Sequence, residues 1–324
     1  MSDSGTITFD YFLDVGGNPE SLCFSPNGYW GLIGSHTTTY PPTQRVTIIR
    51  INKNMDISVS GYLFNDQENL VSISPDSLYG VYGFDLKTIR YYSDGTFKAI
   101  PNQNPPLAAF DAPFSSYNGR MISQNGRGII IESTLLDDGR TTTTGFILDI
   151  NPDFPNADIA ISPDGKTCVL IGVGPHHVIS LRIHKEGGFH IAQMLVPPYG
   201  EPMQVDFTPD SKYAIISYWS DYHNPGLVSY SIGDDSTLTE VDAEYIPPTG
   251  AGEDMAVTPD GKYAVTRTIS AQSGYSDFYV VSIYPDGKMQ YLPDKTYRTS
   301  GDVSAIAFVP PQKTEADSSW AMYH

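Results

Sequence analysis

The chain has 324 residues, of which 37 are acidic and 19 basic, so its formal net charge is −18. This negative charge repels nucleic acids and anionic membrane surfaces, and we expect neither as a partner. The two cysteines, Cys23 and Cys168, lie inside apolar runs, which argues against a zinc or disulfide framework and predicts buried thiols. No basic segment followed by an apolar one opens the sequence, and no run of 18 apolar residues occurs, so we expect a cytoplasmic, non-spanning protein.

In chain order, one short turn motif recurs seven times. In most units it combines Ser or Thr with Pro, then Asp or Asn with Gly or Ser, and it follows a short apolar run. The units are SLCFSPNG (21–28), VSISPDS (71–77), RMISQNGR (120–127), DIAISPDGK (158–166), QVDFTPDSK (204–212), DMAVTPDGK (254–262) and the degraded AIAFVPPQK (305–313). The turns fall near residues 25, 74, 123, 162, 208, 258 and 309, at intervals of 39–51 residues. A repeat of this length indicates a modular architecture.

Each unit has the pattern of short β-strands. Apolar residues alternate or cluster over four to eight positions, and Gly, Pro, Asn and Asp separate the clusters. The clearest third strands of a unit are 45–51, 177–183, 227–233 and 277–284. Four strands per repeat are typical of a β-propeller. We therefore predict an all-β fold, a seven-bladed β-propeller that forms a single domain over residues 1–324.

The Ser-Pro-Asp-Gly-Lys turn followed by an aliphatic strand, as at 162–171, resembles the repeats of YVTN-repeat propellers and of the lactonase-like (6-phosphogluconolactonase-like) family of seven-bladed propellers. The resemblance covers nearly the whole chain. It implies the fold, and it implies a small-molecule substrate handled by a set of His, Glu and Arg residues. The turn itself is a structural device, because Pro and Asp-Gly favour a tight reversal.

The two ends of the chain predict how the ring closes. The last unit is followed by only one candidate strand, 320–324, whereas 6–15 precedes the first unit. We expect the N-terminal strand 6–15 to join the last blade, because closure removes a free sheet edge. The third unit is also short, and no fourth strand is evident after 143–150.

Histidines gather in one class of loop. If the four strands of a blade run outward from the axis, all Ser-Pro-Asp-Gly turns fall on one face and the loops between second and third strands on the other. Four of the seven histidines occur in the latter loops: His36, His176, His177 and His223. Acids and amides that precede the inner strands, such as Asn118 and Glu253, would lie near the mouth of a central channel. Two interpretations of these loop residues are open: they form a functional site, or they belong to an ordinary polar, acidic surface.

Four charged residues occupy positions where the sister units are small or apolar. They are Arg120, Glu132, Asp206 and Arg267. A lone buried charge is costly, so these residues need partners or polar surroundings. They indicate either a functional site or a buried ion-pair network that fixes the packing of the blades.

The connection 101–119 between the second and third units is long and rich in Pro. Its large side chains Phe110, Phe114 and Tyr117 argue against disorder. We predict a lid or pocket wall for an organic ligand; the alternative is a plug over the channel mouth.

The leading functional hypothesis is a small-molecule enzyme of lactonase, cyclase or lyase type. Acid–base chemistry would come from His176, His177 and His223 with Glu132, and Arg120 and Arg267 would hold a substrate carboxylate or an oxyanion. Substrate contacts are expected from His36, Asp206, Phe110, Phe114, Tyr117, Tyr222, Asn118 and Glu253. A nucleophilic Ser in a G-x-S-x-G motif is absent from the sequence.

Two alternatives belong to other classes. A metal-dependent hydrolase or lyase would bind a divalent metal through imidazoles or oxygens, although adjacent strand residues such as His176 and His177 point to opposite sides. A non-catalytic propeller would bind protein or glycan through aromatic groups such as Tyr218, Trp219 and Tyr222. No cofactor is established by the sequence, and we expect a monomer.

Overall fold

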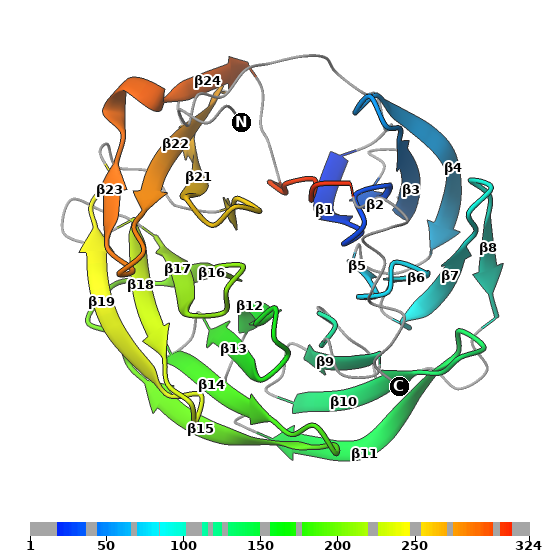
Figure 1. Cartoon of the computed structure of the whole chain (residues 1–324), viewed down its shortest axis with the longest axis horizontal. Coiled ribbons are helices and arrows are strands. Elements are labelled where there is room, and N and C mark those ends of the chain that lie inside the picture. The colour runs from blue at the N-terminus through cyan, green and yellow to red at the C-terminus, as the bar shows by residue number, and fades with distance from the viewer. Residues whose placement is uncertain are drawn as a thin grey trace.

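The structure is a computed structural model that describes residues 18–36, 44–65, 70–83, 85–101, 112–115, 119–124, 129–149, 156–172, 177–219, 226–246, 254–270, 275–300 and 305–312. Within them, antiparallel sheets follow one another around a ring (Figure 1). The all-β propeller prediction is confirmed. Among the described residues, no helix is long and apolar enough to span a membrane.

The first three sheets contain the strands up to residue 149. Blade one consists of β1 (Asn18–Phe24), β2 (Trp30–His36), β3 (Gln44–Ile51) and β4 (Ile57–Asn65). Blade two consists of β5 (Val71–Ile73), β6 (Tyr79–Tyr82), β7 (Lys87–Tyr91) and β8 (Phe97–Ile100). Blade three consists of β9 (Arg120–Gln124), β10 (Ile129–Leu135) and β11 (Thr141–Asp149).

The next three sheets complete the described ring. Blade four consists of β12 (Asn156–Ile161), β13 (Thr167–Gly172), β14 (His177–Ile183) and β15 (Phe189–Leu195). Blade five consists of β16 (Pro202–Phe207), β17 (Tyr213–Tyr218), β18 (Leu227–Ile232) and β19 (Leu238–Glu244). Blade six consists of β20 (Asp254–Val257), β21 (Tyr263–Ser270), β22 (Tyr275–Ile283) and β23 (Met289–Tyr291), and after a short 3₁₀ turn (Pro293–Lys295) β24 (Tyr297–Ser300) also pairs with β22.

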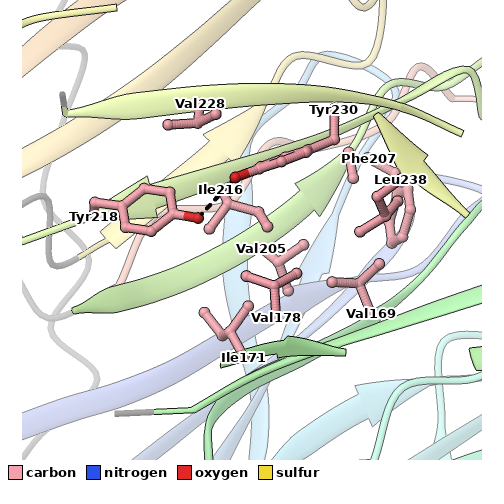
Figure 2. Packing of buried hydrophobic residues seen from close by; sticks show 11 residues of the cluster. Val169, Ile171, Val178, Val205, Phe207, Ile216, Tyr218, Val228, Tyr230 and Leu238 are labelled. Atoms are coloured by element: carbon pink, nitrogen blue, oxygen red, sulfur yellow. Dashed lines mark hydrogen bonds between the residues drawn. The ribbon is translucent and has the colours of Figure 1, made fainter. Parts of the chain in front are cut away.

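The hydrophobic core lies between neighbouring blades. Between blades four and five, Val169 and Ile171 pack in one cluster with Val205 and Ile216 (Figure 2). On the inner strands β12 and β16 the side chains alternate, because successive residues of a strand point to opposite faces. Buried aliphatic residues therefore alternate with half-buried residues that include carboxylates. This alternation turns the polar side chains of one inner strand toward the next blade, as Asp158 and Asp206 show.

The recurring turn is held by its own side chains. In blade four, the Ser162 hydroxyl donates to Asp164 over 2.7 Å, and the Thr167 N–H donates back to the Ser162 oxygen over 3.0 Å. The same pair of bonds forms around Ser74 in blade two, through Asp76 and the N–H of Tyr79. The motif therefore fixes the reversal between the first two strands of a blade, as the sequence predicted.

The turn of the third blade does not lie near residue 123. The Ser115 N–H donates to the Arg120 carbonyl over 2.7 Å, and this bond corresponds to the one from Ser162 to Thr167 over 2.8 Å. Residues 112–115 thus occupy the inner position, with a single bridge from Phe114 to Met121, and β9, β10 and β11 are the second, third and fourth strands. The predicted register was wrong because residues 123–126 (SQNG) keep the spacing from Ser to Asn-Gly of the first unit (SPNG), whereas 115–119 (SSYNG) have one residue more between Ser and Asn-Gly.

The described residues form six sheets, and the prediction of seven strand-built blades is corrected accordingly. The seventh turn segment, 305–312, has no strand assignment and lies beside β1 (Figure 1). Its Gln312 amide donates to the carbonyls of Gly28, Ile51 and Asn52 over 2.7–3.3 Å. The segment 6–15, expected to close the ring, lies outside the described residues.

Candidate functional site

Only some of the predicted site residues lie in the part of the chain that the structure describes. Seven lie outside the described residues: Phe110, Tyr117, Asn118, His176, Tyr222, His223 and Glu253. His36 ends β2, but its side chain is not among those described. The geometry of the site therefore rests on Phe114, His177 and the four charged exceptions of the repeat.

Arg120 and Glu132 form a buried pair that holds the next blade. The Arg120 guanidinium lies 3.5 Å from Glu132, donates to the His184 carbonyl over 2.6 Å and donates also to the Lys185 carbonyl. Glu132 in turn accepts the Gly188 N–H at 3.1 and 3.2 Å. Both charges thus bind the backbone of the β14–β15 turn of blade four, on the face that bears the Ser-Pro-Asp-Gly turns.

Other blades use the equivalent positions for the same contact. Tyr79 and Tyr213 begin the second strands of their blades, as Arg120 does, and their hydroxyls donate to carbonyls of the next blade's turn, those of Asp137 and Pro285. The corrected register aligns Glu132 with Ser229, whose hydroxyl donates to the Gly287 carbonyl over 2.7 Å. Arg120 and Glu132 are therefore the charged version of a repeated contact between blades.

Arg267 lies at the opposite end of its blade. It pairs across strands with Asp254, the first residue of β20, while the turn begins beyond the last residue of that strand. Arg267 and Asp254 are buried, and the Arg267 Nε lies 3.8 Å from a carboxylate oxygen of Asp254. This pair therefore lies at the end of the ring that also bears the start of β14, where His177 is half-buried.

Asp206 belongs to a row of polar side chains on the inner strands. One carboxylate oxygen accepts the Val257 N–H of blade six over 2.7 Å, and the other accepts the Phe207 N–H over 2.7 Å. Gln204, two residues earlier, accepts the N–H of Met255. Asp158 makes the corresponding contact from blade four, since it accepts the Val205 N–H over 2.8 Å. These side chains satisfy N–H groups on the open edge of each neighbouring inner strand.

The same position changes the acidity of Asp206. Burial raises the pKa of Asp206 to about 6, and the nearby Asp158 carboxylate adds to the increase. The two backbone donors, Val257 and Phe207, oppose it without cancelling it. A carboxyl group that titrates near neutral pH can accept and return a proton in catalysis. For brevity we call four residues on the inner two strands of blades five and six, Asp206, Gln204, Asp254 and Arg267, the blade 5–6 seam. Gln204 and Asp206 contact the backbone of blade six, whereas Asp254 and Arg267 pair within that blade.

Phe114 packs between two blades. It bridges to Met121 and lies against the buried cluster of Leu70, Val81 and Met121 between blades two and three. Residues 112–115 therefore belong to the inner position of a blade, and the predicted role of the connection 101–119 as a lid or pocket wall stays a prediction. Tyr218, considered as a surface contact, is fully buried, and its hydroxyl lies 3.1 Å from that of Tyr230 (Figure 2).

The structure thus separates the four charged exceptions. Arg120 and Glu132 meet on the turn-bearing face, Asp206 contacts the backbone of blade six, and Arg267 pairs with Asp254 at the opposite end of that blade. Gln204 was missed, although Asp158, Gln204 and Asp254 each lie four residues before the turn residue of their unit. Within the described residues, no group of three or more His, Cys, Asp or Glu side chains is arranged to hold a metal ion.

Comparisons with known proteins agree on the fold. No protein-family model matches the chain, and no curated protein matches its sequence. A putative 6-phosphogluconolactonase from Bacteroides fragilis superposes with a TM-score of 0.70 at 14% identity, covering 90% of this chain and 86% of its own. The periplasmic gluconolactonase of Pseudomonas aeruginosa gives 0.67 at 13% identity, covering 87% and 85%. Sqt1 from Chaetomium thermophilum gives 0.64 at 12%, covering 91% and 76%. At these identities the likeness establishes a shared propeller fold.

Proposed function

We propose that the protein is a small-molecule hydrolase of lactonase type, which acts at the blade 5–6 seam. The observation that carries this proposal is the presence of two unusual groups on the inner strands of adjacent blades: a buried guanidinium, Arg267, and a carboxyl group with a pKa of about 6, Asp206. The fold shared with gluconolactonases supports the same class of substrate. A related cyclase or lyase reaction would use the same groups.

Two catalytic contributions are needed to open the ring of a lactone. A water molecule must lose a proton as it attacks the carbonyl carbon, and the carbonyl oxygen gains negative charge in the transition state. Asp206 would accept the proton, since its pKa lies close to neutral. Arg267 would stabilise the developing oxyanion or hold a substrate carboxylate through its fork of N–H donors. His177, at the same end of the ring as Arg267, would provide a further acid–base group.

The test is a pH-stat assay of the full chain on a panel of sugar lactones and simple aliphatic lactones. Arg267→Lys is the site variant, and Arg120→Lys is the matched control, because both change a buried Arg beside a carboxylate. Circular dichroism first establishes a temperature at which all three proteins are folded. We expect the parent and Arg120→Lys to hydrolyse one lactone class and Arg267→Lys to lose most of that activity. Equal loss in both variants, or no hydrolysis by the parent, contradicts the proposal.

A second candidate is a non-catalytic binding propeller. Trp219 follows β17 and Tyr245 follows β19, so both lie at the end of blade five away from its turn, and they are 46% and 56% exposed. Exposed aromatic side chains of this kind serve in contacts with proteins and glycans. Quenching of Trp fluorescence by an oligosaccharide panel, lost in Trp219→Ala, would favour this function if no lactone is hydrolysed.

A further inference from the structure

Two histidines outside the proposed site meet at the tip of blade four. His184 begins the turn between β14 and β15, and His190 is the second residue of β15. The His184 Nε2 and the His190 Nδ1 lie 2.8 Å apart, and both rings are exposed to solvent. The turn is on the face that bears the Ser-Pro-Asp-Gly motifs, whereas Arg267 and Asp254 pair at the opposite end of their blade.

The rings meet edge to edge. Their planes differ by 25° and their centroids are 4.9 Å apart. A separation of 2.8 Å between nitrogens is shorter than the spacing of stacked ring faces, so the nitrogen edges of the two rings face each other. A metal ion held at about 2.0–2.1 Å by two imidazoles would place their nitrogens roughly 2.9–3.4 Å apart. The nitrogens are therefore within a few tenths of an ångström of this spacing, and each ring must also rotate so that its lone pair points at the shared ion.

The backbone that carries the pair is already held in place. Arg120 donates to the carbonyls of His184 and Lys185, and Glu132 accepts the Gly188 N–H, so blade three binds the turn at both of its ends. A turn that is fixed before binding loses less conformational entropy when a ligand arrives. The fold therefore sets the positions of the backbone that carries the two imidazoles before an ion binds.

The charged groups near the two rings include both signs. Arg182 pairs across strands with His190, but its guanidinium donates to the Asp234 carbonyl of blade five. In the turn, the exposed Lys185 and Glu186 carry opposite charges. The face around the two rings thus has no single dominant sign of charge among these groups.

We propose that His184 and His190 form a two-imidazole binding site for a divalent transition-metal ion, of the kind represented by Zn²⁺, Ni²⁺ and Cu²⁺. Imidazole nitrogens suit these ions, whereas Ca²⁺ and Mg²⁺ prefer oxygen. Binding replaces the hydrogen bond between the rings. The ring that donates in this bond moves its proton to its other nitrogen through solvent, so that both facing nitrogens offer a lone pair to the ion. Water completes the coordination and leaves positions for an external ligand.

The experiment is a titration of the full chain with Zn²⁺ by calorimetry and with Cu²⁺ by pulsed EPR. We expect one equivalent of Zn²⁺ to bind the parent, and His184→Gln and His190→Gln to weaken that binding by about tenfold or more, since even loss of an outer-shell contact costs 10–100-fold. Lys185→Gln, an exposed change in the same turn, is the matched control and should bind at least as tightly as the parent.

The Cu²⁺ spectrum decides how many rings bind the ion. We expect the modulation of two imidazoles in the parent and of one in each His variant. Parent-like Zn²⁺ affinity in both His variants overturns the site, as does a spectrum with one imidazole or none in the parent. Because both side chains are exposed, the variants are expected to fold, and circular dichroism verifies this.

Discussion

Two buried pairs of Arg and carboxylate, Arg120–Glu132 and Arg267–Asp254, occupy opposite ends of their blades and differ in what they contact. The first pair binds three backbone groups of the following blade, in a position where other blades use Tyr, Thr or Ser. The second lies beside the row of polar inner-strand side chains. The difference teaches that burial and charge identify unusual residues, while their neighbours decide whether those residues hold the ring together or serve a site.

The largest expected effect is on the turn-bearing side. Arg120→Met leaves Glu132 as a buried charge and removes the donors to the His184 and Lys185 carbonyls. Breaking one partner of a buried pair costs about 3–5 kcal/mol, and we expect the free energy of unfolding to fall by that amount. Urea unfolding followed by circular dichroism measures it. Parent-like stability together with lost activity would assign Arg120 to the site and reverse the comparison.

On the opposite side, Arg267→Lys keeps the positive charge beside Asp254 and removes the planar fork of donors. If Arg267 stabilises an oxyanion, kcat should fall about 10²–10³-fold, the loss found when one such donor is removed. The melting temperature should stay close to that of the parent. Steady-state kinetics on the lactone identified by the panel, with thermal melts alongside, separates these effects; a lower melting temperature with unchanged kcat makes Arg267 structural.

The third prediction concerns pH and Asp206. Its pKa rises from 3.8 to about 6 in the fold, so the native protein binds the proton more tightly than the unfolded chain. The contribution of Asp206 to stability is therefore greatest below about pH 4 and declines as the pH rises to about 6, by up to ~3 kcal/mol.

Urea unfolding of the parent and of Asp206→Asn between pH 4 and pH 7 checks this. The difference between the two proteins should change over that interval and stay constant above it. A difference that is independent of pH would mean that Asp206 titrates normally, and it would remove the proposed base.

The smallest effect tests the corrected register of the third blade. Ser162→Ala removes the bonds to Asp164 and to the Thr167 N–H and should cost about 1–2 kcal/mol. Ser123→Ala removes only a long contact of 3.4 Å to the Ile131 carbonyl and should cost clearly less. Equal costs would indicate that Ser123 acts as a turn residue after all.

The sequence was sufficient for the propeller fold and for most turn positions, because the Ser-Pro-Asp-Gly motif is local and fixes its own hydrogen bonds. It failed at the third turn, where Ser115 keeps the backbone bond but the residues after it lack Pro and Asp. Arg120 and Glu132 were recognised as unusual, but their partners lie 56–65 residues away and belong to the next blade. Such contacts leave no periodic signal in the chain.

The blade 5–6 seam shows the same limit of prediction from sequence. Asp206 stood out as a charge at a small position, whereas its raised pKa depends on burial in the folded protein and on the carboxylate of Asp158 in blade four. Gln204 could have been found, because acidic or amide residues recur four positions before three of the turns. The repeat therefore predicts where polar groups lie, and the packing of neighbouring blades decides their acidity.

The most direct test of the central claim is a crystal structure of the protein with the hydroxy acid that its preferred lactone yields. The account predicts that the carboxylate of this ligand contacts Arg267 at the blade 5–6 seam, while Arg120 and Glu132 keep their bonds to the turn of blade four. A ligand bound against Arg120 and Glu132, with the Arg267–Asp254 pair untouched, would contradict it.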